Sequence, residues 1–312
     1  MSLSFDIVII GAGVIGLSVG YEFAKNGKTT LIIEKNNKTG LINSSRNTEV
    51  IHAGIYYKPD SLKKKLCIQG KNELYEFCNK YKIKHKKIGK LFLAIDNNDI
   101  HKLNSTFEVA LQNDIKLKEI NESKLKALEP NVIGKQALLS ETSGIFDSYD
   151  FIQKLEYLFT DNEGIIAFNS SISNINEISE NYFKLLLDDN DKTEINSKVV
   201  INCAGMNSLE LSNNFFQTNM DIKNNFVKGS YLKIQNKTLV NHIIYPAIVP
   251  GEIVERVDCT PTIHGDIRFG PSIDKDKSLN NFEVSKNLKL KFLPSIKKYI
   301  KNFDDQNLLE DI

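Results

Sequence analysis

Three glycines and one acid carry the most specific chemistry in this sequence. Gly11, Gly13 and Gly16 follow a continuous apolar run at the spacing that opens a phosphate-binding helix. Gly11 allows the tight turn, Gly13 lets backbone N–H groups approach a pyrophosphate, and Gly16 lets the helix pack closely on the strand. Glu34 lies about 20 residues later, where a carboxylate suits a pair of ribose hydroxyls and would repel a 2′-phosphate. This order predicts a dinucleotide site that disfavours NADP; the alternative is a glycine turn without a ligand.

A polar loop beyond the acid offers further groups to the same ligand. Its members are Ser44, Ser45, Arg46 and Asn47. They can donate hydrogen bonds to a pyrophosphate or a flavin ring, and Lys35, next to the acid, is assigned to the same site. His52 follows in an apolar segment, where its imidazole can accept a proton. A core histidine is the alternative for His52.

Hydrophobic periodicity predicts the elements that must position these residues. The expected helices cover residues 14–26, 61–80, 99–114, 122–128, 150–160 and 284–302, the last interrupted at Pro294. The expected strands cover residues 7–10, 28–34, 89–95, 198–205, 226–234 and 242–246, with short strands in 165–187 and a hairpin in 260–271. Six lysines from Lys80 to Lys90 predict a solvated face or hairpin edge; an anion-binding or membrane-surface patch is the alternative.

Composition places the chain among ordinary globular proteins. It has 312 residues, 41% of them hydrophobic, and a net charge of +1, which gives no reason to invoke nucleic acid. The four cysteines are far apart and contain no CxxC, so we expect neither a disulfide framework nor a metal site, and a reducing cytoplasm fits. The first strand begins within five residues of Met1, which leaves no room for a signal peptide, and no apolar run approaches membrane-spanning length.

Arginine is scarce in this chain. Of 40 basic residues only three are arginine, namely Arg46, Arg256 and Arg268. In a chain that otherwise uses lysine, an arginine is favoured where a planar bidentate fork is needed.

The segment from Ser44 to Tyr57, followed by Pro59, Ser61-Leu-Lys and Leu66-Cys67, resembles the L-2-hydroxyglutarate dehydrogenase (oxidase) family. These are FAD-dependent oxidoreductases of the D-amino-acid oxidase-like group. The resemblance implies FAD rather than NAD, which the glycines alone leave open. The implied activity is oxidation of a small 2-hydroxy acid, L-2-hydroxyglutarate to 2-oxoglutarate, by hydride transfer to the flavin.

The resemblance also implies an α/β architecture with two domains. A discontinuous Rossmann-like FAD-binding domain is expected in residues 1–80 and 140–220. A substrate domain built on an antiparallel sheet (α+β) is expected in residues 81–139 and 221–275, with a C-terminal helical segment in 276–312.

Site residues carried over from the family lie in both domains. Ala204 and Gly205, at the end of the strand 198–205, are expected against the FAD. His52 is the expected base and Arg268 the expected carboxylate clamp. Tyr57 and Tyr231 are expected as hydrogen-bonding walls of the substrate site.

The chain departs from the family pattern in two places. Asp258 stands where the family has a histidine, and a carboxylate there could serve as a base but would repel a dianionic acid. Family members continue past this C-terminus, so we expect the 312-residue chain to hold FAD weakly and turn over poorly.

Alternative readings therefore stay open. One is a truncated or degenerate flavin-binding homologue without turnover, and another is a flavin enzyme acting on an amino acid, a glycine derivative or glycerol phosphate. The electron acceptor (a quinone, oxygen or another) and the oligomeric state are not indicated. Peripheral association with the inner face of a membrane is left open beside the cytoplasmic location.

Overall fold

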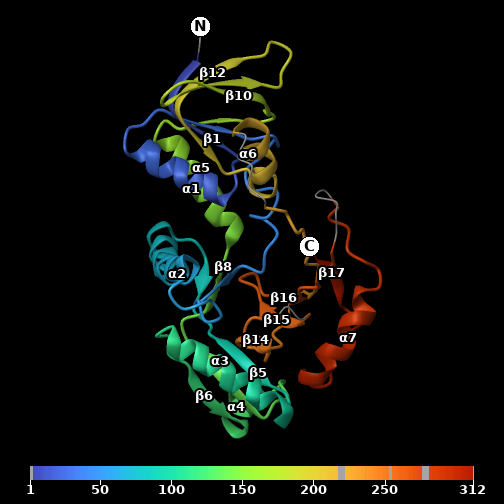
Figure 1. The fold of residues 1–312 in the computed structure, drawn as a ribbon. Helices are drawn as coiled ribbons and strands as arrows, with labels where there is room; N and C mark the ends of the chain where they lie inside the picture. Colours follow the sequence, from blue (N-terminus) through green and yellow to red (C-terminus); the bar gives the residue numbers. More distant parts are fainter. Residues whose placement is uncertain (1–2, 217–221, 236, 253–254, 276–280, 312) are drawn as a thin grey trace. The chain divides into compact units, whose positions relative to one another are not determined.

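The computed structural model describes residues 3–216, 222–235, 237–252, 255–275 and 281–311. The chain forms two compact units, each built from two separate segments (Figure 1). Unit 1 comprises Met1–Asn47 and Ser148–Asn225, and unit 2 comprises Thr48–Asp147 and Phe226–Ile312.

The boundaries between the two compact units differ from the expected domain boundaries. Residues 48–80 and 140–147 belong to unit 2, because strands from both segments pair in one small sheet there. The expected boundaries near residues 220 and 276 fall at or beside residues outside the described ranges. Which unit binds which ligand stays a proposal.

Unit 1 is built on a six-stranded sheet in the order β10-β11-β12-β1-β2-β9. Its strands are β1 (Leu3–Ile10), β2 (Thr30–Ile33), β9 (Ile165–Ala167), β10 (Ile172–Ser179), β11 (Tyr182–Leu187) and β12 (Glu194–Asn202). β1 pairs in parallel with β12 and β2, whereas β10 and β11 add an antiparallel edge. The apolar run of β1 is buried, as expected of a central parallel strand covered on both faces.

Helices cover the sheet of unit 1. They are α1 (Val14–Lys25), α5 (Ser148–Asp161) and α6 (Ser208–Phe216), with a 3₁₀ turn η2 (Gly205–Asn207) before α6. α1 and α5 lie side by side, and α6 packs on β10 and β12 (Figure 1). The expected strand–helix–strand unit that presents the glycines is thereby confirmed.

Unit 2 contains an eight-stranded sheet in the order β17-β13-β16-β15-β14-β5-β7-β6. Its strands are β5 (Lys90–Ala94), β6 (Lys118–Asn121), β7 (Gln136–Ser140), β13 (Tyr231–Ile234), β14 (Ile243–Pro246), β15 (Asp258–Pro261), β16 (Ile267–Gly270) and β17 (Leu309–Asp311). The expectation of an antiparallel sheet holds except for β5 and β14, which run parallel. These two strands come from different segments of the chain, so no hairpin constrains their direction.

A three-stranded antiparallel sheet and five helical elements complete the described part of unit 2. The sheet consists of β3 (Val50–Ile51), β8 (Gly144–Phe146) and β4 (His85–Lys86). The helical elements are α2 (Leu62–Tyr81), η1 (Asn97–Asp99), α3 (Ile100–Gln112), α4 (Glu122–Leu128) and α7 (Leu288–Tyr299). The Ser61 side chain accepts a hydrogen bond from the Lys64 backbone N–H and so caps α2.

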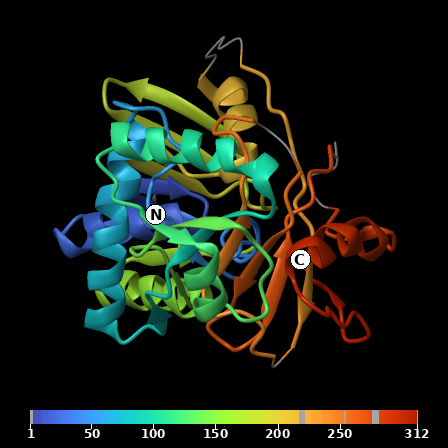
Figure 2. The same cartoon turned by 90° about the horizontal axis from the view of Figure 1, so that it is seen from below.

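The interruption expected at Pro294 is wrong. α7, drawn in red in Figure 2, runs from Leu288 through Pro294 to Tyr299. It packs on β16. Proline removes one backbone donor, but the buried side chains of Phe292, Ile296 and Tyr299 hold both halves of the helix against the sheet.

Side chains alternate across the large sheet and so define its two faces. Leu91, Leu93 and Ile244 join the core under α7, together with Cys259 and Phe269. Phe92, Ala94, Ile243 and Tyr245 join a second core with Leu103 and Ala110 of α3. No helix in the described part of the chain combines the length and the apolar character that crossing a bilayer requires.

Candidate active site

The glycine turn of unit 1 is too tight for side chains at two of its positions. A Cβ on Gly16 would lie 1.9 Å from the Gly11 carbonyl oxygen. A Cβ on Gly11 would lie 2.5 Å from the Cys203 carbonyl oxygen, and the φ of Gly11 is +105°. Gly13 differs, because its backbone is extended and a Cβ there would have the Ser44 hydroxyl as its nearest neighbour, at 3.2 Å.

The N-terminus of α1 is suited to an anion. Its first turn contains no acidic residue, and the cap residue Gly13 carries no side chain that could occupy the backbone donors. The Ser44 hydroxyl accepts a hydrogen bond from the Val14 N–H at 3.0 Å, which brings the polar loop to this helix end.

Glu34 is held beside the glycine turn. One carboxylate oxygen accepts from the Ala12 N–H at 2.8 Å, and the other accepts from the Asn36 N–H at 2.9 Å and from its side-chain amide at 2.7 Å. The neighbouring Lys35 is exposed. Three donors therefore fix the carboxylate at the end of β2, where ribose hydroxyls can reach it.

The rest of the predicted cofactor residues lie around the same turn. Gly205 has a φ of +59° and open space around it, and Ala204 lies next to the glycine turn. In the polar loop, the Arg46 guanidinium donates to the Leu41 carbonyl, the Ser45 hydroxyl to the Ile42 carbonyl and the Asn47 amide to the Ser44 carbonyl. These bonds make the loop a self-supporting segment.

The residues present fit a dinucleotide. The turn has no side chain at Gly13, the first turn of α1 has no acid to repel an anion, and a fixed carboxylate stands at the next strand end. These features would hold the pyrophosphate and ribose of FAD.

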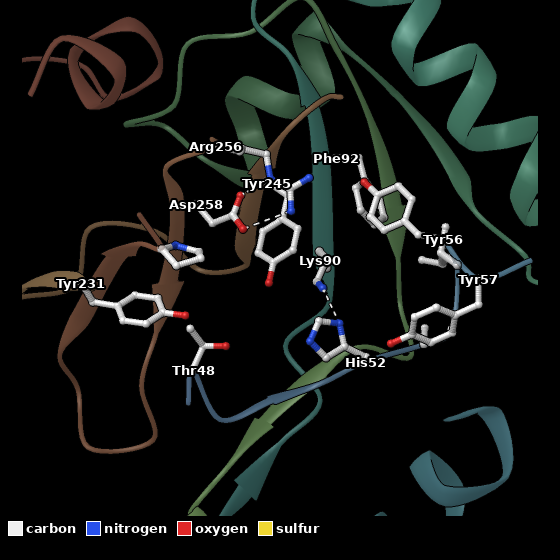
Figure 3. Close-up of a pocket in the computed structure, with 14 residues that line it drawn as sticks. Thr48, His52, Tyr56, Tyr57, Lys90, Phe92, Tyr231, Tyr245, Arg256 and Asp258 are labelled. Atoms are coloured by element: carbon white, nitrogen blue, oxygen red, sulfur yellow. Dashed lines mark hydrogen bonds and ion pairs between the residues drawn. The ribbon is translucent and has the colours of Figure 1, made fainter. Parts of the chain in front are cut away.

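Unit 2 contains a cavity of about 320 Å³. Its lining includes His52, Lys90, Tyr245, Arg256 and Asp258 (Figure 3). Thr48, Tyr56, Tyr57, Phe92, Tyr231 and Pro271 also line it.

The strand register explains why these side chains meet. Lys90 and Phe92 of β5, Tyr245 of β14 and Asp258 of β15 alternate with the residues that face α7, and so share the opposite face of the sheet. The segment that follows β3 supplies His52 to Tyr57. The buried Asn113 side chain donates to the carbonyls of Ile55 and Tyr57, at 3.1 and 2.8 Å, and fixes this segment.

His52 and Lys90 contact each other in this cavity. Lys90 Nζ lies 3.4 Å from His52 Nδ1 and 3.9 Å from the centroid of the Tyr245 ring. His52 is open to the cavity, whereas Lys90 is 3% exposed. The positive charge of Lys90 and then burial against protein lower the pKa of His52, and burial lowers that of Lys90 to about 7.

Arg256 and Asp258 form a buried ion pair. Arg256 Nε lies 2.5 Å from Asp258 Oδ1, and its Nη2 donates to Oδ2 at 3.1 Å. The guanidinium lies 4.3 Å over the Tyr245 ring. Burial raises the pKa of Asp258 to about 6, although Arg256 opposes this shift.

Four buried polar atoms of cavity residues make no hydrogen bond of good geometry with the described residues. Arg256 Nε and Asp258 Oδ1 lie against each other in the ion pair, whereas Arg256 Nη1 and the Tyr56 hydroxyl have no ion-pair partner; the Tyr56 hydroxyl lies beside the Arg256 and Thr106 side chains. An unpaired buried donor costs about 1–3 kcal/mol, so a ligand that pairs with it gains this amount. A carboxylate or phosphate oxygen suits both groups.

The predicted carboxylate clamp lies outside this cavity. Arg268 donates through Nε to Asp311 at 2.6 Å and through Nη1 to Glu49 at 3.1 Å. It shares the face of the sheet with Asp258 but is paired with Thr260, two residues further along β15. Two carboxylates therefore already satisfy its charge, and the clamp role of Arg268 stays a prediction. The predicted site residues His52, Asp258, Tyr57 and Tyr231 do line the cavity, Asp258 at the position where the chain departs from the family.

Lys90 and Tyr245 were missed as site residues, and Tyr56 was not singled out. Lys90 was expected on a solvated face, which holds for the exposed Lys82, Lys84, Lys86 and Lys87 but is wrong for Lys90. A signal was present, because Lys90 is the first residue of an otherwise apolar strand. Arg256 was one of the three arginines, and its pairing with Asp258 fits the use expected of an arginine in this chain.

Comparison with known proteins supports this reading of the sequence. The profile of the family described as FAD dependent oxidoreductase (DAO) matches residues 6–311. The mitochondrial L-2-hydroxyglutarate dehydrogenase of Arabidopsis thaliana is 30% identical over 97% of this chain and 71% of that relative. The enzyme of the same name from Caenorhabditis elegans is 32% identical over 86% of this chain and 63% of the relative.

A third relative has a different name. The glycerol 3-phosphate dehydrogenase of Caloramator mitchellensis is 30% identical over 86% of this chain and 56% of the relative. The chain thus spans 56% to 71% of the length of these three relatives.

Solved structures share the fold. The L-alpha-glycerophosphate oxidase of Mycoplasma pneumoniae, solved with FAD bound, has a TM-score of 0.88 at 21% identity over 98% of this chain and 81% of that chain. The glycine oxidase of Geobacillus kaustophilus has a TM-score of 0.79 at 16% identity over 96% and 79%.

Proposed function

Since the chain belongs to the FAD-dependent oxidoreductase (DAO) family, we propose that it binds FAD and oxidises L-2-hydroxyglutarate to 2-oxoglutarate. The relatives of that name at 30–32% identity support the substrate class. When bound, FAD supplies the acceptor for the hydride that leaves C2 of a 2-hydroxy acid.

The observation that carries this proposal is the unpartnered Arg256 Nη1 in the cavity of unit 2, which has no partner among the described residues. A substrate carboxylate can accept from this atom, which orients the acid. Lys90 lines the same cavity, beside His52. Tyr57 and Tyr231 add hydroxyls to the walls of the site.

The chain's own acid–base chemistry acts on the substrate hydroxyl. His52 is open to the cavity and takes this proton as the hydride leaves. The aromatic walls, among them Phe92 and Tyr245, restrict water around the reacting atoms.

Anaerobic flavin reduction tests the proposal. The protein is saturated with FAD and desalted, and its oxidised flavin absorbance is followed after addition of L-2-hydroxyglutarate without NAD. We expect part of the flavin to be retained, in keeping with the weak FAD binding expected of this chain, and its absorbance to be lost on addition of the acid. His52→Ala should slow this loss by roughly 100-fold. Absence of flavin after desalting contradicts the proposal at its first step. An unchanged rate in His52→Ala would remove His52 from the mechanism and point to Asp258.

Glycerol 3-phosphate is the second candidate substrate. The relative from Caloramator mitchellensis favours it, and a phosphate oxygen can pair with Arg256 as a carboxylate does. Adding each acid to separate samples of the same flavin-loaded protein decides between the two. The faster reduction at equal concentration identifies the better substrate.

A further inference from the structure

Lys90 is a buried lysine whose nearest hydrogen-bonding partner is a histidine. It begins β5, is 3% exposed, and places Nζ 3.4 Å from His52 Nδ1. The ring faces of Tyr245 and Phe92 lie 3.9 and 5.9 Å from Nζ. Among the described residues no ion pair joins Lys90 to a carboxylate, and the nearby Asp258 is paired with Arg256. A buried ammonium in this setting is costly, and its neutral form is favoured.

The orientation of His52 connects Lys90 to the cavity. Nδ1 faces Lys90, and the other ring nitrogen points away from Lys90, toward the side of the site where Thr48 and Tyr231 lie (Figure 3). If Lys90 is an ammonium, it donates to Nδ1, so the ring proton is on Nε2 and the imidazole cannot accept a proton from the cavity. If Lys90 is a neutral amine, it accepts from Nδ1–H, and Nε2 is left with a free lone pair.

We propose that His52 and Lys90 form a two-residue proton relay, in which His52 takes the substrate hydroxyl proton and Lys90 stores it. This inference rests on the proposed function and adds a residue to it. Lys90 is the final proton acceptor, and His52 is the group that touches the substrate.

The step balances within these groups. The substrate O–H bond breaks and an Nε2–H bond forms, while the Nδ1–H bond breaks and a third N–H bond forms on Lys90 Nζ. His52 begins and ends neutral, and Lys90 gains one positive charge. The electron pair of the substrate C2–H bond leaves as hydride to FAD, the oxidant that the proposed function supplies.

The pKa shifts agree with the geometry. Burial lowers the pKa of Lys90 to about 7, with Asp258 raising it and Arg256 lowering it. The charges of Lys90, Arg256 and Lys63, together with burial, lower that of His52 to about 3. At neutral pH an added proton therefore resides on Lys90, and a histidine with so low a pKa would be a weak base if it acted alone.

Nitrogen NMR of the imidazole tests the relay without any turnover. The ¹⁵N shifts of His52 report its tautomer and its charge in FAD-free protein labelled at histidine. In the wild type we expect His52 to stay neutral down to about pH 5 and its proton to move from Nε2 to Nδ1 as the pH rises through about 7. In Lys90→Met we expect ordinary protonation, with a midpoint at least one to two pH units higher than in the wild type, toward about 6.5.

Two further variants make the result decisive. Lys87→Met removes an exposed lysine and should leave the His52 titration at its wild-type position. Lys90→Arg keeps a permanent cation and should hold His52 in the Nε2–H tautomer at every pH, because arginine does not deprotonate. An equal His52 midpoint in wild type and Lys90→Met, or a tautomer insensitive to pH in the wild type, overturns the relay.

The flavin reduction rate provides the second readout. In the wild type the rate should fall as the pH is lowered through about 7, where Lys90 becomes charged. Lys90→Arg should lose at least about 10-fold at all pH values, and a wild-type rate in this variant overturns the relay. If no hydroxy acid reduces the flavin of the wild type, the proposed function fails while the NMR result still decides whether the pair exchanges its proton.

Discussion

Arg256 and Asp258 lie two residues apart and pair with each other, Nε 2.5 Å from Oδ1, on the face of the sheet that lines the cavity. The Asp258 charge cancels that of Arg256 at short range but leaves Nη1 without a partner among the described residues. The net charge that an acid meets at this wall is therefore smaller than the arginine alone would give.

Asp258→Asn should increase the affinity for a dicarboxylate. The amide keeps an acceptor for the guanidinium and removes one negative charge from the wall, which we expect to lower the KM for L-2-hydroxyglutarate by about 10-fold, or 1.4 kcal/mol. Steady-state kinetics measure this change. Asp161→Asn removes an exposed acid of unit 1 and serves as the matched control. A KM that stays the same or rises would show that Asp258 does not oppose the substrate charge.

The two arginines of the sheet face should respond differently to removal. Arg256→Met is expected to raise the KM for the acid by roughly 100-fold, because the unpartnered donor of the cavity is lost. Arg268→Met should leave the KM within about threefold and lower the free energy of unfolding by about 2 kcal/mol, since Glu49 and Asp311 each lose the guanidinium, although Asp311 keeps Lys233. Kinetics and urea unfolding of both variants separate these effects. The reverse pattern would support Arg268 as the carboxylate clamp.

Lys90 should make stability depend on pH. Its pKa is lowered from 10.5 to about 7 on folding, so between these values the unfolded chain binds more protons than the folded one. The free energy of unfolding then rises with pH in this window, by about 2 kcal/mol between pH 7 and 9 from this residue. Below pH 7 both states hold the proton and the full cost of burying the charge remains. Denaturant unfolding of FAD-free wild type and Lys90→Met at pH 7 and pH 9 measures the difference, and equal pH dependence in both proteins would contradict it.

Substitutions in the glycine turn should distinguish a loss of FAD binding from a loss of folding stability. Gly13→Val should abolish FAD retention with little loss of stability, because its backbone is extended and only a side-chain hydroxyl stands near its Cβ position. Gly16→Ala should destabilise unit 1 even without FAD, because its Cβ would meet a backbone carbonyl. Gly70→Ala in α2 has open space and should stabilise the chain by about 0.5–1 kcal/mol. Desalting after FAD loading and thermal unfolding of the FAD-free proteins test all three.

Sequence periodicity was sufficient to predict most helices and strands, because each of them depends on a local sequence pattern. The apolar runs of β1 and β5 and the cap at Ser61 all depend on residues close in the chain. The parallel pairing of β5 with β14 could not be predicted this way, since it joins residues about 150 positions apart.

The cavity was only partly predictable for the same reason. His52 and Asp258 were predicted through the resemblance. Lys90 could be identified as a site residue only from the folded sheet, which places it beside His52. Arg268 shows the converse, because Glu49 and Asp311 lie 219 and 43 positions away from it and no local pattern indicates that they neutralise its charge.

The pairing of β1 with β12 has a consequence during synthesis. Leu3 pairs with Ile195, so one edge of β1 stays unpaired until about 190 further residues have been synthesised. At translation rates of about 5–20 residues per second this interval lasts roughly 10 to 40 s. Throughout this interval the unpaired backbone N–H and C=O groups along one edge of Ile7 to Ile10, with their apolar side chains, are available to other chains. A ribosome-associated chaperone that shields this strand should therefore raise the yield of folded protein more than one added after release.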